Sequence, residues 1–194
     1  MCLIEINYEL KMKKRLAKYI VLFLVLITGC SADLHTKRLA LKNIPHYESL
    51  TIVDGFMELS YTENKGMVFG VWNNQESILK YLVVIGMTFI SIMFIGYIIW
   101  RVRHLSFLYL LPLALILAGA FGNLFDRVRF GHVIDFIHIY WKDYFNWPFL
   151  FNLADVLICF GEFLLIILII TKKKDVLGCF MQRSIPESKS DVKM

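Results

Sequence analysis

Two aspartates in apolar surroundings are the residues of this sequence best suited to chemistry. Asp155 lies in "FNLADVLICFGEF", about six residues into an apolar run, and Asp135 lies in "HVIDF", between Ile and Phe. Burial disfavours the charged form of a carboxyl group. If two such groups meet, one keeps its proton while the other acts as a base. Such a pair can activate water for attack on an amide carbonyl and protonate the carbonyl oxygen.

Each aspartate also has a purely structural interpretation. Asn152 precedes Asp155 by three residues, so the two would share a helix face and could serve only as polar contacts between helices. Asp135 could be a surface loop residue that forms an ion pair with Arg127 or Arg129. The residues alone leave these alternatives open.

More polar residues follow the small residues of "AGAFGNLFDRVRF", which allow a helix to pack closely. Asn123 and Asp126 are one helical turn apart, and Arg127 is four residues after Asn123. They arrive as the apolar run ends, so we expect them at the same membrane surface as the two aspartates.

A metal site is a further possibility, because His132, Asp135 and His138 form an H-x-x-D-x-x-H pattern. Zinc accepts nitrogen and oxygen ligands. However, no helix is indicated here that would bring the three side chains to one face, and the sequence has no H-E-x-x-H motif. We therefore expect no metal and no cofactor.

Composition indicates what must position these residues. The chain has 194 residues, of which 58% are apolar, and a mean hydropathy of +0.60. Soluble domains are about 45–50% apolar. The excess lies in four runs close to the length of about 20 residues that a membrane span needs. These runs are roughly Leu16–Leu34, Ile78–Trp100, Leu105–Asn123 and Phe149–Thr171.

The net charge of +5 reports orientation in a membrane rather than a nucleic-acid partner. Basic clusters fall at 11–18, at 101–103 and at 172–174. Short segments rich in Lys and Arg stay on the cytoplasmic side. We therefore expect both termini in the cytoplasm and two outer loops, 35–77 and 124–148. In this scheme residues 1–15 are an N-terminal extension, 16–171 the four-span domain and 172–194 a cytoplasmic tail.

The first outer loop is expected to carry a small sheet that lies against the membrane. "TIVDGFMELSYT" is rich in β-branched and aromatic residues and has a break at Gly55, which is typical of two short strands. A short amphipathic segment, "VWNNQESILKYL", should lead into the second span. The expected fold is therefore four transmembrane helices with a small β-rich extracytoplasmic subdomain.

The end of the first apolar run resembles a lipoprotein cleavage site, because Ile27-Thr28-Gly29-Cys30 follows lysines and an apolar stretch. A cleaved lipoprotein would need only one such run, whereas this chain has four. We expect the four residues to lie within the first helix and to remain uncut. The four cysteines show no metal-ligand spacing.

Five short motifs occur in order along residues 17–171: "DLHTK", "NKGMVF", "GNLFDR", "GHVIDF" and "FNLAD". Each is weak alone. Together, on a four-span topology, they resemble the lipoprotein signal peptidases, also called signal peptidase II, which are four-span aspartic proteases of the bacterial cytoplasmic membrane.

The resemblance implies that Asp135 and Asp155 are the catalytic pair. Supporting or substrate-binding roles are implied for Asp33, Lys37, Asn64, Gly66, Asn123, Asp126, Arg127 and Asn152. The implied substrate is a prolipoprotein whose Cys carries diacylglycerol, cut just before that Cys at the extracytoplasmic face. Membrane lipid is the implied surrounding, no nucleic acid is involved, and a monomer is expected.

Two other functions are compatible with a polar membrane bundle. A scaffold or transporter subunit could use the polar residues as contacts between helices, although internal repeats and broken helices, typical of transporters, are not evident. A different intramembrane aspartic protease would be expected to carry G-x-G-D, which is absent. Glu162, in the fourth apolar run, departs from the family pattern. It is either a neutral packing residue or part of the site's hydrogen-bond network.

Overall fold

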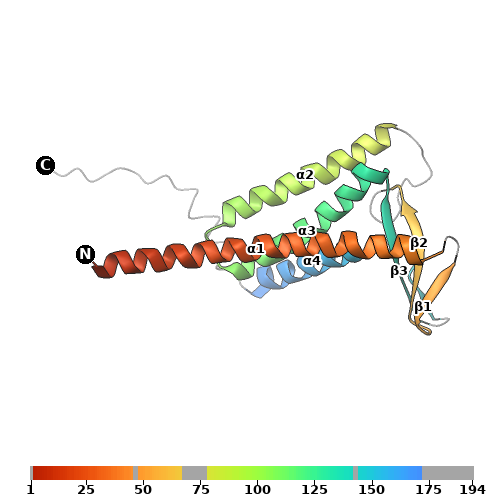
Figure 1. Cartoon of the computed structure of the whole chain (residues 1–194), viewed down its shortest axis with the longest axis horizontal. Helices are drawn as coiled ribbons and strands as arrows, with labels where there is room; N and C mark the ends of the chain where they lie inside the picture. Colours follow the sequence, from red (N-terminus) through yellow and green to blue (C-terminus); the bar gives the residue numbers. More distant parts are fainter. Residues whose placement is uncertain (1, 46–47, 67–77, 142–143, 172–194) are drawn as a thin grey trace.

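The computed structural model describes residues 2–45, 48–66, 78–141 and 144–171. Within these ranges the elements are α1 (Cys2–Asn43), β1 (Ser49–Val53), β2 (Met57–Asn64), α2 (Ile78–Val102), α3 (Phe107–Phe130), β3 (Val133–Trp141), β4 (Phe145–Asn146) and α4 (Leu153–Thr171). All four helices are long and apolar enough to cross a membrane. The strands gather at the end of the bundle opposite the N-terminus (Figure 1). The expected fold class is confirmed.

The central helix of the bundle is α3. In its most apolar window 61% of the residues are buried, against 11–17% in the other three helices. It packs against α1, α2 and α4. Ala118 and Ala120 are buried, and the small residues around them allow its neighbours to approach closely. The central position follows from this run of small side chains.

The packing of α4 on α3 leaves no room for a methyl group at two glycines. A Cβ at Gly119 would collide with the carbonyl oxygen of Ala154 and lie 2.8 Å from Ile158 Cγ1. A Cβ at Gly161 would lie 2.7 Å from the carbonyl oxygen of Pro112. Backbone-to-backbone contact therefore fixes the first turn of α4, which carries Asp155, against α3.

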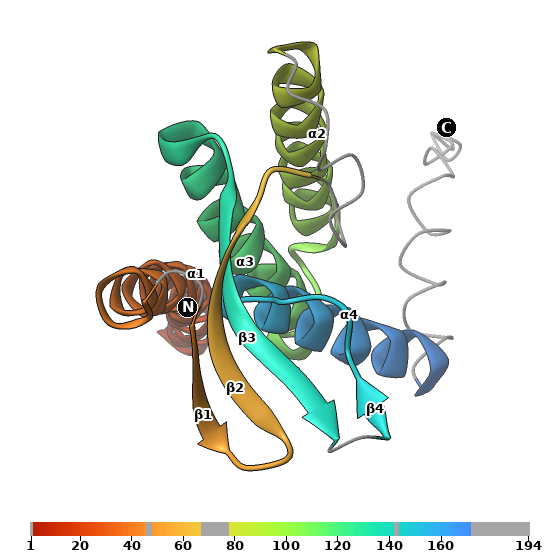
Figure 2. The ribbon, with the colours of Figure 1, turned by 90° about the vertical axis from the view of Figure 1, so that its right-hand side faces the viewer.

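The sheet is antiparallel, with strand order β1-β2-β3-β4. Gly55 has a φ of +69° in the β1–β2 turn, a conformation that favours glycine, and the two strands expected around it are confirmed. An isolated antiparallel bridge joins Ile137 of β3 to Phe151, just before α4. Figure 2 shows the sheet lying across the ends of α1 and α4.

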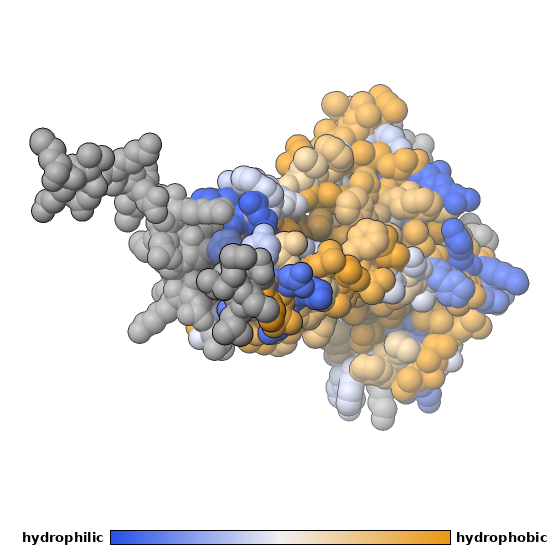
Figure 3. Space-filling view, turned by 60° about the vertical axis from the view of Figure 1, so that its left-hand side comes forward, coloured by the Kyte–Doolittle hydropathy of each residue, from blue (hydrophilic) through white to orange (hydrophobic). Residues whose placement is uncertain are grey.

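The outside of the bundle is apolar. On α2, Phe89, Ile90, Met93 and Phe94 are all more than half exposed, as expected for side chains that face lipid. Apolar surface covers the middle of the molecule, and hydrophilic residues gather towards its two ends (Figure 3).

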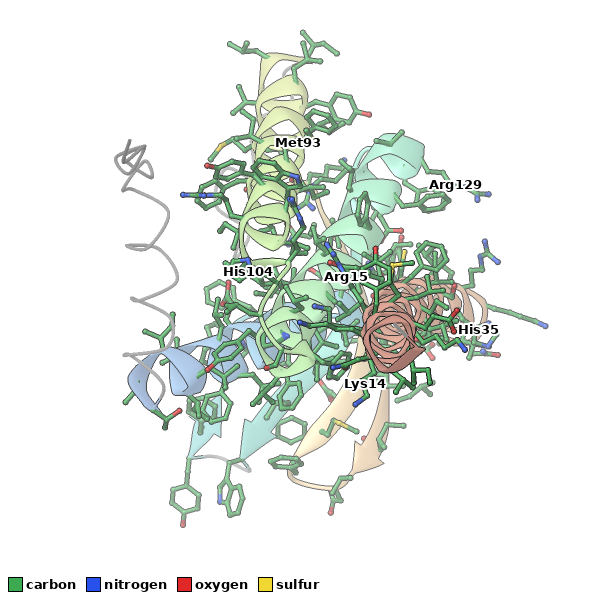
Figure 4. All side chains as sticks on the ribbon, turned by 90° about the vertical axis from the view of Figure 1, so that its left-hand side faces the viewer. Lys14, Arg15, His35, Met93, His104 and Arg129 are labelled. Atoms are coloured by element: carbon green, nitrogen blue, oxygen red, sulfur yellow. The ribbon has the colours of Figure 1, made fainter. Side chains whose placement is uncertain are left out.

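Basic residues near the N-terminus lie beside the α2–α3 turn. Lys18 Nζ donates hydrogen bonds to the carbonyl oxygens of Arg103, at 2.8 Å, and Leu105, at 2.9 Å. Lys14, Arg15 and His104 lie at this same end (Figure 4). Two of the three basic clusters thus share the end opposite the sheet. The third, 172–174, lies outside the described residues, as do the tail 172–194 and most of the expected amphipathic segment.

The helix ends differ from those expected from hydropathy. α1 continues to Asn43 rather than ending near residue 34, and α3 continues to Phe130. The polar residues that end the apolar runs are buried against partners, so they do not end the helices. Conversely, α4 begins at Leu153, four residues after Phe149, because the segment before it pairs with β3. α1 also runs unbroken through residues 27–30.

We predict that Gly119→Ala destabilises the protein by about 1–3 kcal/mol through overpacking and lowers its activity, because α4 must shift. Gly86→Ala in α2 is the matched control, since nothing lies within 4 Å of its added Cβ. Thermal unfolding in detergent measures both. Equal stability of the two variants would contradict the close contact between α3 and α4.

Candidate active site

A cluster of buried ions centres on Lys37. Its Nζ lies 2.8 Å from Asp33 Oδ2 and 2.8 Å from Asp126 Oδ2, and it donates a hydrogen bond of 2.8 Å to Asn123 Oδ1. The exposed fraction of the Lys37 side chain is 2%. The ammonium group thus contacts three oxygens, two of them in ion pairs with carboxylates and one in a hydrogen bond. Breaking a buried pair of this kind by removing one partner costs about 3–5 kcal/mol.

The two aspartates of this cluster also connect elements that are distant in the sequence. Asp33 Oδ1 accepts a hydrogen bond of 2.8 Å from the backbone N–H of Ala154, in the first turn of α4. Asp126 Oδ2 accepts one of 3.4 Å from the backbone N–H of Ile134, in β3. Gly122 makes room for this arrangement, because a Cβ there would collide with the Asp33 carboxylate. The buried ions therefore position both β3 and the start of α4.

Asn123 transmits this arrangement to Asp155. Lys37 can only donate, so the amide of Asn123 must present Oδ1 to it. The amide nitrogen then faces the other way and donates to Asp155 Oδ1 at 2.9 Å. Asn152 Nδ2 also donates to Asn123 Oδ1, at 3.2 Å.

Asp155 lies in a capping box at the N-terminus of α4. Asn152 Oδ1 accepts from the backbone N–H of Asp155 at 3.1 Å, and Asp155 Oδ2 accepts from the backbone N–H of Asn152 at 3.1 Å. This reciprocal pair occupies two N–H groups that have no partner within the helix. The spacing of Asn152 and Asp155 had suggested that they share a helix face. Instead, Asn152 precedes the helix and caps its N-terminus. A carboxylate in a first helical turn is stabilised by the helix dipole.

Asp135 lies on β3 and is 3% exposed. Its Oδ1 accepts from Asn152 Nδ2 at 2.6 Å, and its Oδ2 accepts from Asn64 Nδ2 at 3.0 Å. Asn64 is held in turn by the backbone N–H of Gly66, which donates to its Oδ1 at 3.0 Å. Burial, followed by the nearby charge of Asp155, raises the pKa of Asp135 to about 7.

Asp135 and Asp155, here called the acid pair, are joined by one residue. Asn152 donates to Asp135 from its side chain and to Asp155 from its backbone. All four carboxylate oxygens of the pair accept an amide N–H, from Asn64, Asn123 or Asn152. The arrangement can hold one proton on one acid and leave the other as a base.

The structure brings the ten residues implied by the sequence to the end of the bundle that carries the sheet. Arg127 is the most peripheral: its Nη1 donates to the carbonyl oxygen of Asn123 at 3.3 Å. Asp135 makes no ion pair with Arg127 or Arg129 in the part of the chain that is described, so the surface-loop interpretation is wrong. Arg129 instead lies over the rings of two phenylalanines and points away from the bundle (Figure 4).

Three features of the site were missed from the sequence. The backbone N–H of Ala154 binds Asp33, Phe151 pairs with β3, and Tyr81 donates from its hydroxyl to the carbonyl oxygen of Arg127 at 3.1 Å. The N-x-x-D pattern before an apolar run was a signal for the capping box of α4. No comparable local signal marks Tyr81 or Phe151.

The histidines of the H-x-x-D-x-x-H pattern do not converge on Asp135. Side chains alternate along a strand, so a spacing of three turns His138 to the face opposite Asp135. His138 Nδ1 instead lies 2.8 Å from Glu58 Oε1. His132 lies 3.7 Å from a Glu63 oxygen.

Comparison with known proteins places the chain in a family. Residues 21–171 match the family model described as Signal peptidase (SPase) II. The lipoprotein signal peptidase of Syntrophotalea carbinolica is 35% identical over 153 residues, which cover 79% of this chain and 92% of the relative. That of Syntrophus aciditrophicus is 39% identical over 129 residues, or 66% of this chain and 79% of the relative.

A solved structure shares the fold. A bacterial membrane enzyme determined by the in meso method at 2.3 Å resolution superposes with a TM-score of 0.62 at 22% identity. The match covers 89% of this chain and 94% of the other. The order of the motifs, the four-helix fold and the matched family model agree. The chain belongs to the signal peptidase II family of lipoprotein signal peptidases, and it is a membrane-embedded peptidase.

Proposed function

We propose that this protein is an aspartic endopeptidase that removes signal peptides from diacylglyceryl-modified prolipoproteins by cleaving before the lipidated Cys. The acid pair would catalyse the reaction. The observation that carries this proposal is the joining of Asp135 and Asp155 through Asn152 at the end of the helix bundle.

The surroundings of the two acids support different roles. Asp155 accepts backbone and side-chain N–H groups at a helix N-terminus, an environment that stabilises a carboxylate. Asp135 is buried on a strand and has a pKa raised to about 7. Asp155 is therefore the base in our proposal, and Asp135 carries the proton.

The reaction then runs through one tetrahedral intermediate. Asp155 takes a proton from water as the water oxygen bonds to the scissile carbonyl carbon, while Asp135 donates its proton to the carbonyl oxygen. When the C–N bond breaks, Asp155 gives its proton to the leaving nitrogen. A hydroxyl of the intermediate returns a proton to Asp135, so both acids regain their starting states.

We place the acid pair at the extracytoplasmic face and both termini in the cytoplasm. The acid pair lies at the end of the bundle with the sheet, whereas Lys14, Arg15 and Lys18 in the N-terminal part of α1 lie with the α2–α3 turn at the other end. Positive residues favour the cytoplasmic side. A Cys anchored by diacylglycerol at the outer surface would bring the scissile bond to the acids. Because one chain supplies both acids and their described donors, a monomer suffices.

We also propose that the sheet lies on lipid. In β3 the side chains of Asp135, Ile137, Ile139 and Trp141 share a face, and Asp135 directs that face towards the start of α4. Paired strands extend the same face with Leu50, Met57 and Leu59, whereas Thr51, Glu58 and His138 lie on the other. Trp141 is 57% exposed. An apolar face that continues from the bundle end suits the membrane interface.

Asp135→Asn and Asp155→Asn should each abolish cleavage of a lipidated prolipoprotein, because each removes the acid or the base while keeping a side chain of the same size. Asp54→Asn, an exposed aspartate in the β1–β2 turn, is the matched control and should cleave normally. Product is measured in vesicles, with insertion checked for every variant. Normal turnover by either acid-pair variant would refute the assignment.

Activity should fall as the pH rises through about 7, because Asp135 loses the proton it must donate. The hydrogen bond from Asn64 favours the ionised form and lowers the pKa of Asp135. Asn64→Ala should therefore move the alkaline limb of kcat/KM to higher pH, whereas Asn43→Ala, at the end of α1, should not. A limb that moves to lower pH in Asn64→Ala would contradict the role of Asp135 as acid.

Lipid contact can be read from tryptophan fluorescence. A variant with Trp141 as its only tryptophan should be quenched strongly by brominated lipids. Tyr140→Trp combined with Trp141→Phe, in the same background, moves the probe to the opposite face and should reduce the quenching. Equal quenching at the two positions would contradict the proposed orientation of the sheet.

A further inference from the structure

The face of α4 that carries Asp155 is open. Ala154, Gly161 and Leu168, spaced by seven, are the buried residues of α4, and the first two lie against α3. The next stripe contains Asp155 and Glu162, also seven apart, and is turned by about 100° around the helix. Glu162 is exposed. The stripe that leads down from the acid pair is therefore not covered by the described helices.

Glu162 is the middle residue of α4, with nine residues on either side. An ionisable side chain at the centre of a span costs about 2.5–3.5 kcal/mol on insertion scales and by default marks a functional site. In the described part of the chain, no hydrogen bond or ion pair engages its carboxyl group. The acid-pair mechanism does not use it either.

The proposed substrate creates a need for such a group. A peptide bond inside a helix is shielded, so the segment that enters the acid pair must be unwound. Within hydrocarbon, each N–H and C=O group freed by unwinding is costly unless it finds a partner. Glu162 lies about 10 Å below Asp155 along the helix, from seven residues at 1.5 Å each. About three extended residues, at roughly 3.3 Å each, span that distance.

We infer that Glu162 binds the unwound backbone of the signal peptide about three residues before the scissile bond. A neutral carboxyl group offers one O–H donor and one C=O acceptor, which match the C=O and N–H of a peptide backbone. Glu162 is thus a substrate-binding residue that stabilises the extended segment within the membrane. The inference rests on the proposed function.

A double-mutant cycle, with one change in the enzyme and one in the substrate, tests this contact. Semi-synthetic lipidated prolipoproteins carry a backbone ester in place of one amide, two, three or four residues before the scissile bond, which removes a single N–H. With the wild-type enzyme, one of these esters should lower kcat/KM by about tenfold, the scale of a lost hydrogen bond that leaves a buried group unpaired. With Glu162→Leu, the all-amide substrate should already be about tenfold slower, and the same ester should add nothing.

Two further variants separate binding from packing. Glu162→Gln retains a donor and an acceptor and should stay within about twofold of wild type. Phe163→Leu, the exposed neighbour in α4, is the matched control and should leave the ester effect unchanged. Three outcomes would overturn the inference. The ester and Glu162→Leu could lower kcat/KM independently, so that their effects multiply, or no ester could lower kcat/KM of the wild type. Glu162→Leu could also lower the unfolding temperature and reduce kcat/KM equally on every substrate. Cleavage by Asp155→Asn would instead refute the proposed function.

Discussion

Electrostatic balance among buried charged groups is the constraint on which this structure depends. Asp33, Asp126 and Asp135 are at most 3% exposed, and Asp155 lies among them. Their nearby cations are Lys37 and Arg127. If all four acids were ionised, two negative charges would remain uncompensated. Lys37 balances one of the two charges of Asp33 and Asp126. Arg127 balances one of the two charges of the acid pair, so one uncompensated charge remains at the acid pair. Retaining one proton there is the least costly remedy.

The same ions and amides also build the site. Asp33 holds the first turn of α4, Asp126 holds β3, and Lys37 orients the amide of Asn123 towards Asp155. Stability and chemistry are therefore not separable at these positions. Asn152 is the point of convergence, because it caps α4 and contacts both acids. A peptidase whose acids come from a strand and a helix needs such a shared partner to set their separation.

Much of the fold could be predicted from local pattern. The apolar runs predicted four helices, and Gly55 between β-branched residues predicted the β1–β2 hairpin. The ends of α1 and α3 could not be predicted, because hydropathy treats Asp33 and Asn123 as polar and cannot show that they are buried against partners. The start of α4 could not be predicted either, because it depends on the pairing of Phe151 with Ile137, which is a tertiary contact. Motif order indicated the acid pair, but the contact of Asn64 with Asp135 joins residues 71 positions apart and left no local signal.

We propose that the acid pair holds one proton below about pH 7, on Asp135. Infrared difference spectroscopy of the membrane-embedded enzyme measures this directly, because a protonated carboxyl group has a C=O stretch that a carboxylate lacks. In a Glu162→Gln background, we expect a protonated-carboxyl band at pH 6 that disappears with Asp135→Asn and fades as the pH rises through about 7. No such band at pH 6, or a band that persists in Asp135→Asn and disappears only with Asp155→Asn, would contradict it.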